Sequence, residues 1–111
     1  MATLLPRDDD GHPIPALRLR ANGAHTVSVT QTSARNHIAF STETRVIGVY
    51  ATGAVFLQSG NATIAATSSD HYFPGGVYYD ISLGNGQQET HNYLAAIRVD
   101  SDCVLYISEK E

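Results

Sequence analysis

The chain has 111 residues, a size that suits one domain with one hydrophobic core. Eleven acidic residues against seven Lys and Arg give a formal net charge of −4, and the basic residues are scattered, so we expect no nucleic-acid partner. Charged residues are only 16% of the chain, against about 25% in typical soluble domains, which favours a surface that lies partly against a partner.

Residues 1–15 differ in composition from the rest of the chain. They hold three of the four prolines and the acidic run Asp8-Asp9-Asp10, which predicts an extended N-terminal arm ahead of a β-domain over 16–111. The first residues lack a basic region followed by an apolar one, and no stretch has the ~20 apolar residues that cross a bilayer. We therefore expect a protein made in the cytoplasm, without a membrane partner.

From residue 16 onward, short runs of alternating apolar and polar residues follow one another at intervals of about ten residues. Turn residues such as Asn22-Gly23 and Pro74-Gly75-Gly76 separate them, and no window shows helical periodicity. This pattern predicts an all-β domain, a single sandwich or barrel of eight or nine strands. The predicted strands are 16–20, 25–30, 37–41, 45–51, 54–58, 62–66, 77–83, 93–99 and 103–108.

The period of two along a strand assigns residues to faces. The residues expected in the core are Leu17, Leu19, Val27, Val29, Ile38, Phe40, Ile47, Val49, Val77, Tyr79, Ile81, Leu83, Tyr93, Ala95, Ile97, Val99, Cys103, Leu105 and Ile107. The opposite faces carry more apolar groups than a face that meets only water, so we expect these to pack under a loop or against a neighbour. They are Tyr50, Phe56, Tyr78, Leu94, Val104 and Tyr106.

Two short motifs invite a catalytic or metal-binding interpretation. Asp8-Asp9-Asp10 with His12 supplies oxygen ligands but lacks the spacing of a calcium-binding loop, so we interpret it as a solvated turn. Ser68-Ser69-Asp70-His71 contains the residue types of a nucleophilic triad, but adjacent side chains on an extended segment point apart. We interpret it as a polar loop.

The remaining reactive groups are dispersed. Cys103, the only cysteine, excludes an intrachain disulfide and lies in an apolar run, where we expect a small buried hydrophobe. Asn61-Ala62-Thr63 matches a glycosylation sequon but suits a turn. The histidines lie on five separate segments, where we expect surface or loop positions; three of them could still meet at one end of a sandwich. They are His12, His25, His37, His71 and His91. We expect no catalytic, cofactor or metal site, and no enzyme.

The stretch from Arg45 to the end resembles small virion proteins of tailed bacteriophages and prophage-like elements. The resemblance rests on turn and core motifs along about two thirds of the chain. These are Tyr50-Ala51-Thr52, Val55-Phe56-Leu57 with a Gly-Asn turn and Ala62-Thr63, the link 70–77 (DHYFPGGV), 94–99 (LAAIRV) after His91, and 105–109 (LYISE).

The resemblance implies a jelly roll or related β-sandwich and a structural role in the particle. The expected function is that of a capsid decoration or cement protein on the head of a tailed phage, located in the virion and assembled in the host cytoplasm. Its expected partners are the major capsid protein and copies of itself, as a dimer or trimer. The residues expected at these contacts are Leu4, Leu5, Tyr50, Phe56, Tyr78, Val104 and Tyr106.

Two alternatives remain open. The family pattern does not separate a head protein from a tail or spike component. A carbohydrate-binding β-sandwich module would use some of the six tyrosines as an aromatic surface, although the chain has no tryptophan.

Overall fold

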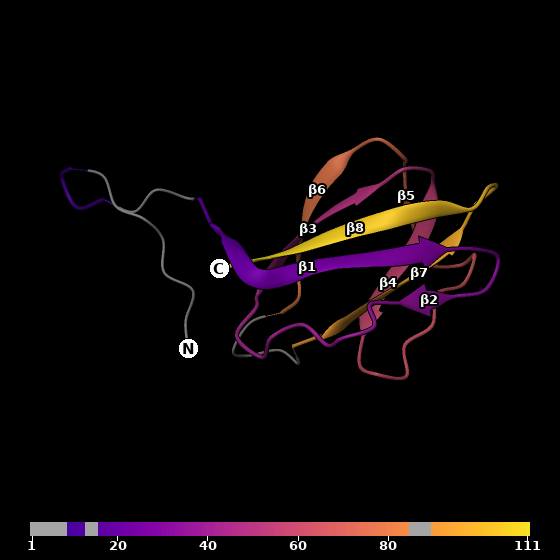
Figure 1. Ribbon diagram of the computed structural model, residues 1–111, viewed down its shortest axis with the longest axis horizontal. Coiled ribbons are helices and arrows are strands. Elements are labelled where there is room, and N and C mark those ends of the chain that lie inside the picture. Colours follow the sequence, from indigo (N-terminus) through magenta and orange to yellow (C-terminus); the bar gives the residue numbers. More distant parts are fainter. Residues whose placement is uncertain (1–8, 13–15, 85–89) are drawn as a thin grey trace.

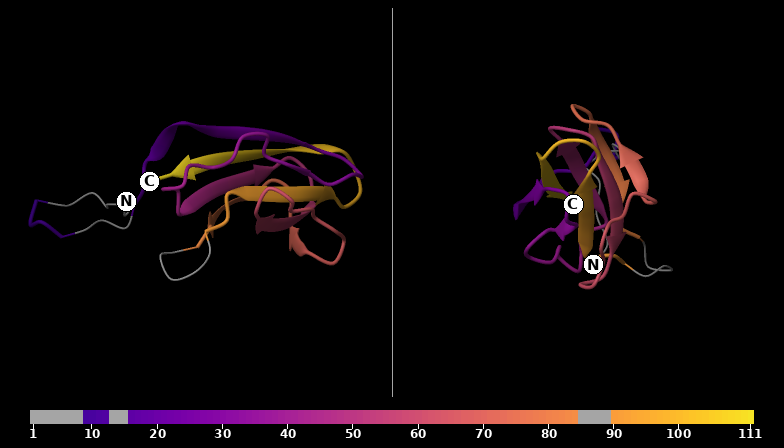
Figure 2. Two further views of the ribbon diagram at one scale, coloured as in Figure 1. Left: turned by 90° about the horizontal axis from the view of Figure 1, so that it is seen from below. Right: turned by 90° about the vertical axis from the view of Figure 1, so that its right-hand side faces the viewer.

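The computed structural model describes residues 9–12, 16–84 and 90–111, and its strands form two antiparallel sheets packed face to face (Figures 1 and 2). No helix in these ranges is long and apolar enough to cross a membrane. The eight strands are β1 (Leu19–Val29), β2 (Ala34–Arg35), β3 (Val46–Ala51), β4 (Val55–Gly60), β5 (His71–Phe73), β6 (Tyr78–Ser82), β7 (Tyr93–Arg98) and β8 (Cys103–Lys110).

The strand order is that of a jelly roll. One sheet has the order β1-β8-β3-β6 and the other β2-β7-β4-β5. The first strand pairs with the last, β2 with β7, β3 with β6 and β4 with β5, so the chain forms one long antiparallel ribbon rolled into two layers. Two further pairs, β3 with β8 and β4 with β7, complete the two four-stranded sheets. The predicted all-β, jelly-roll-like sandwich is therefore confirmed.

Several predicted strand boundaries are wrong. The segments 37–41 and 62–66 are loops, and the two-residue strand β2 precedes the first of them. Strand β5 falls in a segment that we expected to be a loop, because three residues are too short for alternation to show. Of the predicted arm 1–15, the structure describes only 9–12, which are exposed.

The predicted turn at Asn22-Gly23 is instead an irregularity inside one strand. The ladder of β1 with β8 shifts between Leu19, opposite Lys110, and Ala24, opposite Ser108. Asn22 has a φ of 62°, a left-handed conformation that asparagine tolerates better than most residues. The predicted strands 16–20 and 25–30 therefore merge into β1, which begins at Leu19.

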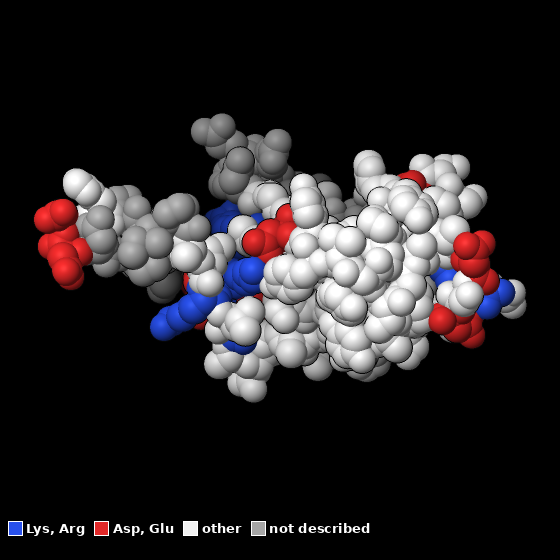
Figure 3. Space-filling model, turned by 90° about the horizontal axis from the view of Figure 1, so that it is seen from above, with Lys and Arg blue, Asp and Glu red and all other residues white. Residues whose placement is uncertain are grey.

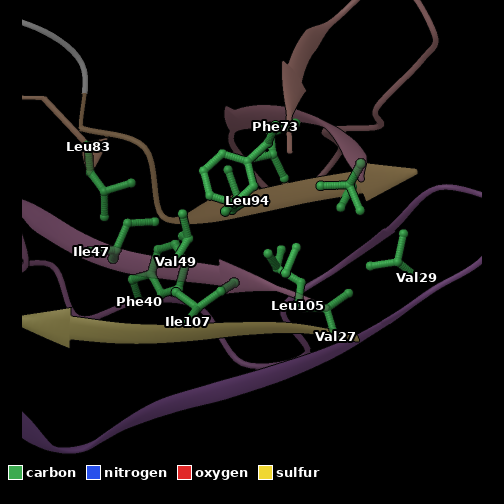
Figure 4. Packing of buried hydrophobic residues seen from close by; sticks show 14 residues of the cluster. Val27, Val29, Phe40, Ile47, Val49, Phe73, Leu83, Leu94, Leu105 and Ile107 are labelled. Atoms are coloured by element: carbon green, nitrogen blue, oxygen red, sulfur yellow. The ribbon is translucent and has the colours of Figure 1, made fainter. Parts of the chain in front are cut away.

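The core lies between the two sheets, and eight of the nineteen residues expected in the core belong to its cluster (Figure 4). Cys103 and Ile81 pack against it from a partly buried position. The core cluster consists of Val27, Val29, Phe40, Ile47, Val49, Ala51, Val55, Leu57, Phe73, Leu83, Leu94, Ala96, Leu105 and Ile107.

Four predicted core residues are exposed instead, namely Leu19, Ile38, Val77 and Tyr79. Leu19 precedes the irregularity in β1, and Ile38 lies in a loop. Val77 directly precedes the edge strand β6 and Tyr79 lies near its start, where one flank has no neighbouring strand.

The inward and outward faces predicted for β7 are reversed. Leu94 and Ala96 face the core, whereas Tyr93, Ile97 and Val99 are only partly buried. Ala95 is also fully buried, but it is not a member of the core cluster. Since β7 is a central strand with covered residues on both sides, alternation carries little information there.

Two long loops complete the fold and lie in different parts of the sandwich. Residues 36–45 connect the two sheets at one end of the sandwich, where Asn36, Phe40 and Thr44 are almost fully buried. Residues 61–70 connect β4 to β5 and run beside the outer face of the sheet β2-β7-β4-β5, as the bonds of Ala62 and Asp70 described below indicate.

Candidate functional site

Three tyrosines form a lateral row on the outer face of the sheet β1-β8-β3-β6. Tyr50 lies directly opposite Tyr106 on one side and Tyr78 on the other, so the three side chains share one face. Their exposed fractions are 38%, 48% and 53%. Val104 lies two residues from Tyr106 on the same face and is partly buried. We call Tyr50, Tyr78, Val104 and Tyr106 the tyrosine face.

The ring of Tyr78 leans along the sheet instead of standing away from it. Its hydroxyl end lies over Gly48, where a Cβ would be 2.6 Å from the ring Cζ, so any side chain at Gly48 would collide with it. Lys110 Nζ lies 4.9 Å from the ring centroid and donates a 2.7 Å hydrogen bond to Asp80 Oδ1. This bond to Asp80, together with Tyr78, raises the pKa of Lys110. Gly48 and Lys110 therefore fix the position of the ring.

The outer face of the second sheet carries a different row. Phe56 lies directly opposite Ile97 on β7 and Tyr72 on β5, and the rings of Phe56 and Tyr72 meet edge to face at 6.0 Å between centroids. Tyr72 is 59% exposed, whereas Phe56 and Ile97 are half-buried. We call these three residues the Phe56 row.

The loop 61–70 covers part of this second outer face. Arg35 Nε donates to the Ala62 carbonyl at 3.1 Å, and Gln58 Nε2 donates to Asp70 Oδ1 at 2.9 Å. Ala95 lies opposite Arg35 and Gln58 in the ladder and is fully buried, although it faces away from the core. The loop therefore shields the part of the sheet that lies beside the Phe56 row.

The residues expected at partner contacts fall on two different faces. Tyr50, Tyr78, Val104 and Tyr106 come together on one sheet, while Phe56 lies on the other. Leu94 was also expected on an outer face, but it lies in the core, so that prediction is wrong. Leu4 and Leu5 lie outside the described residues.

The face of the molecule drawn in Figure 3 is sparsely charged around its middle. Figure 3 views the molecule from the side of the edge strands β5 and β6, and its Lys, Arg, Asp and Glu side chains gather toward the two ends of the body. Among the described ion pairs, Arg98 with Asp102 and Arg18 with Glu111 are at the surface.

Among the residues that the structure describes, the most buried ionisable group is Glu109, which is 2% exposed. One carboxylate oxygen accepts hydrogen bonds from the Ser41 N–H at 2.7 Å and the Thr44 hydroxyl at 2.6 Å, and the other contacts His25 Nε2 at 2.7 Å. Burial opposes ionisation, but the hydrogen bonds from Thr44, His25 and Ser41 outweigh it and lower the pKa of Glu109. The carboxylate thus anchors the loop 36–45 to β1 and β8.

The histidines do not converge in the described part of the chain. His25 is nearly buried beside Glu109 and packs edge-on against Phe40, so its predicted surface position is wrong. His91 Nδ1 lies 2.7 Å from the Ser59 hydroxyl oxygen. His12, His37 and His71 are exposed, and no group of three potential metal ligands occurs among the residues described.

The other motifs have local structural roles. Asp70 accepts hydrogen bonds from the Thr67 N–H and hydroxyl, and the first of these lowers its pKa. Residues 68–70 are therefore a polar turn as expected, but His71 begins β5. Asn61 Oδ1 accepts from the N–H and hydroxyl of Thr63, which confirms the turn at the sequon. Burial raises the pKa of the Cys103 thiol, which packs against the core.

The roles of four residues at these surfaces were not predicted from the sequence. Tyr72 was not paired with Phe56 because β5 was not expected, and the roles of Gly48, Asp80 and Lys110 depend on strands that meet only in the folded sheet. The signal available in the sequence was the period of two, which places Asp80 on the same side of its strand as Tyr78, and Lys110 on the same side as Tyr106.

Comparisons of the chain with protein-family models, with curated proteins and with solved structures find no match.

Proposed function

We propose that the chain is a structural protein of a virion, a capsid decoration or cement protein that binds the outer shell of a tailed phage head and stabilises it. The jelly roll is an architecture of viral capsid proteins as well as of lectins and cupins, so it supports this role without selecting it. The resemblance of the segment from Arg45 to the end to small phage virion proteins favours a virion role among these.

The observation that carries the proposal is the Phe56 row. Phe56 and Ile97 have no polar side-chain atom, and their row ends at the exposed Tyr72 on an edge strand. Centres of protein–protein interfaces are rich in aromatic groups and poor in charge. A partially covered apolar row on a charge-poor domain fits a contact with another protein better than permanent exposure to water.

In this proposal the Phe56 row contacts the major capsid protein, and Leu4 and Leu5 extend the contact. Copies of the chain, as a dimer or trimer, sit on the symmetry axes of the shell. Each contact is weak, but linked copies raise the effective concentration of every further contact. The protein would be assembled into the virion in the host cytoplasm.

The experiment is to purify particles of the phage or prophage that encodes this chain and to locate the protein on them by mass spectrometry and immunogold labelling. The proposal expects labelled heads. Labelled tails or spikes would replace the capsid role with the alternative placement, and absence from intact particles would overturn both.

Two variants test the contact itself. Phe56→Glu and Tyr72→Glu place a charge in the row, and a charge is costly to bury without a partner, so occupancy on particles should fall by at least about tenfold. Tyr106→Glu, which adds the same charge to the other sheet, is the matched control and should be incorporated normally. Circular dichroism of the free proteins establishes that each variant is folded.

A further inference from the structure

The tyrosine face is an aromatic surface that no described segment of the chain covers. Its three rings come from three neighbouring strands, and the row spans two inter-strand distances, or about 10 Å. That length matches two linked sugar rings. Polar side chains lie beside the row, because Thr26 lies opposite Tyr106 at one end of it, and Ser108 and Asp80 lie opposite Gly48 along one side.

The row is also preorganised for binding. Gly48 leaves room for the Tyr78 ring to lean on the sheet, and Lys110 holds it there while donating to Asp80. A tyrosine ring offers a large contact area with few rotatable bonds, so a fixed ring loses little conformational freedom when a ligand binds.

The chemistry of the face indicates the class of ligand. A tyrosine ring has an electron-rich face, which attracts the weakly positive C–H groups on one side of a pyranose ring. The three phenol groups, the Asp80 carboxylate and the hydroxyls of Thr26 and Ser108 can bond to sugar hydroxyls. Since Lys110 and Asp80 neutralise each other, the site attracts neither an acidic nor a basic ligand over a neutral one.

We propose that the tyrosine face binds a neutral glycan, with sugar rings stacked on the row Tyr106–Tyr50–Tyr78 and their hydroxyls bonded to the polar side chains around it. This activity lies beyond the proposed structural role and uses the opposite sheet from the Phe56 row. A protein held on a particle by one sheet would present this face outward.

The test uses the isolated full-length protein, so it does not depend on incorporation into particles. The protein is screened on an array of neutral and acidic oligosaccharides, and each neutral saccharide that binds is titrated by calorimetry. Tyr50→Ser and Tyr106→Ser should each weaken binding at least about tenfold, as loss of a stacking aromatic does in comparable sites. Gly48→Ala should also weaken saccharide binding, because the added methyl group displaces the Tyr78 ring. This variant tests the position of the ring, since all three tyrosines are still present. Tyr72→Ser, an exposed tyrosine on the other sheet, is the matched control and should bind normally.

Three results would overturn the proposal. The first is that no neutral saccharide binds, or that only acidic ones do. The second is that binding survives in Tyr50→Ser and Tyr106→Ser. The third is that light scattering shows an oligomer of the wild type that Tyr106→Ser dissociates, since the row would then be a contact between copies.

Discussion

The two sheets of this sandwich have outer faces of different character, because the long loops of the chain go to different places. The loop 61–70 runs over the outer side of β2-β7-β4-β5 and buries Ala95 there. The loop 36–45 turns inward instead, where Glu109 anchors it between the sheets. No loop in the described part of the chain runs over the tyrosine row on the outer face of β1-β8-β3-β6, whose three tyrosines are 38–53% exposed.

The anchors of the two loops are chemically alike but differ in environment. Glu109 and Asp70 each accept a backbone N–H and hydroxyl hydrogen bonds from loop residues, and each has a lowered pKa. Glu109 is buried, whereas Asp70 lies near the surface. Removing a buried charged partner leaves polar groups unsatisfied, while water replaces a surface partner. The same type of anchor should therefore matter far more inside the sandwich than outside it.

The largest expected effect on stability is that of Glu109→Ala. It leaves His25, Thr44 and the Ser41 N–H without their acceptor, so the free energy of unfolding should fall by about 3–5 kcal/mol. Glu109→Gln retains an acceptor and should cost less. Urea denaturation measures both. The matched control is Glu111→Gln, whose contacts with Arg18 and Arg20 are long, and it should change stability by less than about 0.5 kcal/mol. Equal effects of the two Gln variants would contradict the anchoring role.

The same carboxylate makes stability depend on pH. The pKa of Glu109 is lower in the folded than in the unfolded state, so its contribution is fully present above the ordinary glutamate pKa of 4.5. The contribution is lost as the pH falls through the lower folded value. We expect acid to destabilise the wild type more than Glu109→Gln, measured as the urea midpoint between pH 6 and pH 3. Parallel curves for the two proteins would show that Glu109 is not the group responsible.

Asp70→Asn should have a smaller effect than either Glu109 variant. The side chain keeps an oxygen that can accept from Thr67, and water reaches the site. The urea midpoint should fall slightly, and amide hydrogen exchange should accelerate in the loop 61–70 while the core stays protected. A loss of stability as large as that of Glu109→Ala would mean that the outer loop is as essential to the fold as the inner one.

The smallest expected effect is that of Tyr106→Ser on stability. Nearly half of the side chain is exposed on a face that carries no covering loop, so the free energy of unfolding should change by no more than about 1 kcal/mol. Thermal denaturation monitored by circular dichroism checks this. A larger loss would assign the tyrosine row a structural role in the sheet and weaken the case for a binding surface.

Much of this architecture follows from alternation along the chain. Strands β3 and β8 each have one face in the core and one outside, so a period of two places Val49, Leu105 and Ile107 correctly. Alternation fails on β7, because the core covers Leu94 and Ala96 while Ala95 is buried on the other side.

The candidate surfaces were predictable only in part. Period two placed Tyr50, Tyr78 and Tyr106 on outward faces, which the structure confirms. Their grouping depends on the pairing of β3 with both β6 and β8, and β3 and β8 are far apart in sequence. The separation of Phe56 from the tyrosines follows from which strands share a sheet. Neither property is encoded in local composition.

In the proposed function, the two outer faces of the sandwich have different partners. A cryo-electron microscopy reconstruction of particles that contain the protein would show which face of the sandwich meets the shell. We expect the Phe56 row to lie against the major capsid protein and the tyrosine face to lie toward solvent. A reconstruction in which Tyr50, Tyr78 and Tyr106 are buried against the shell or against a second copy, with the Phe56 row exposed, would contradict this assignment of the two faces.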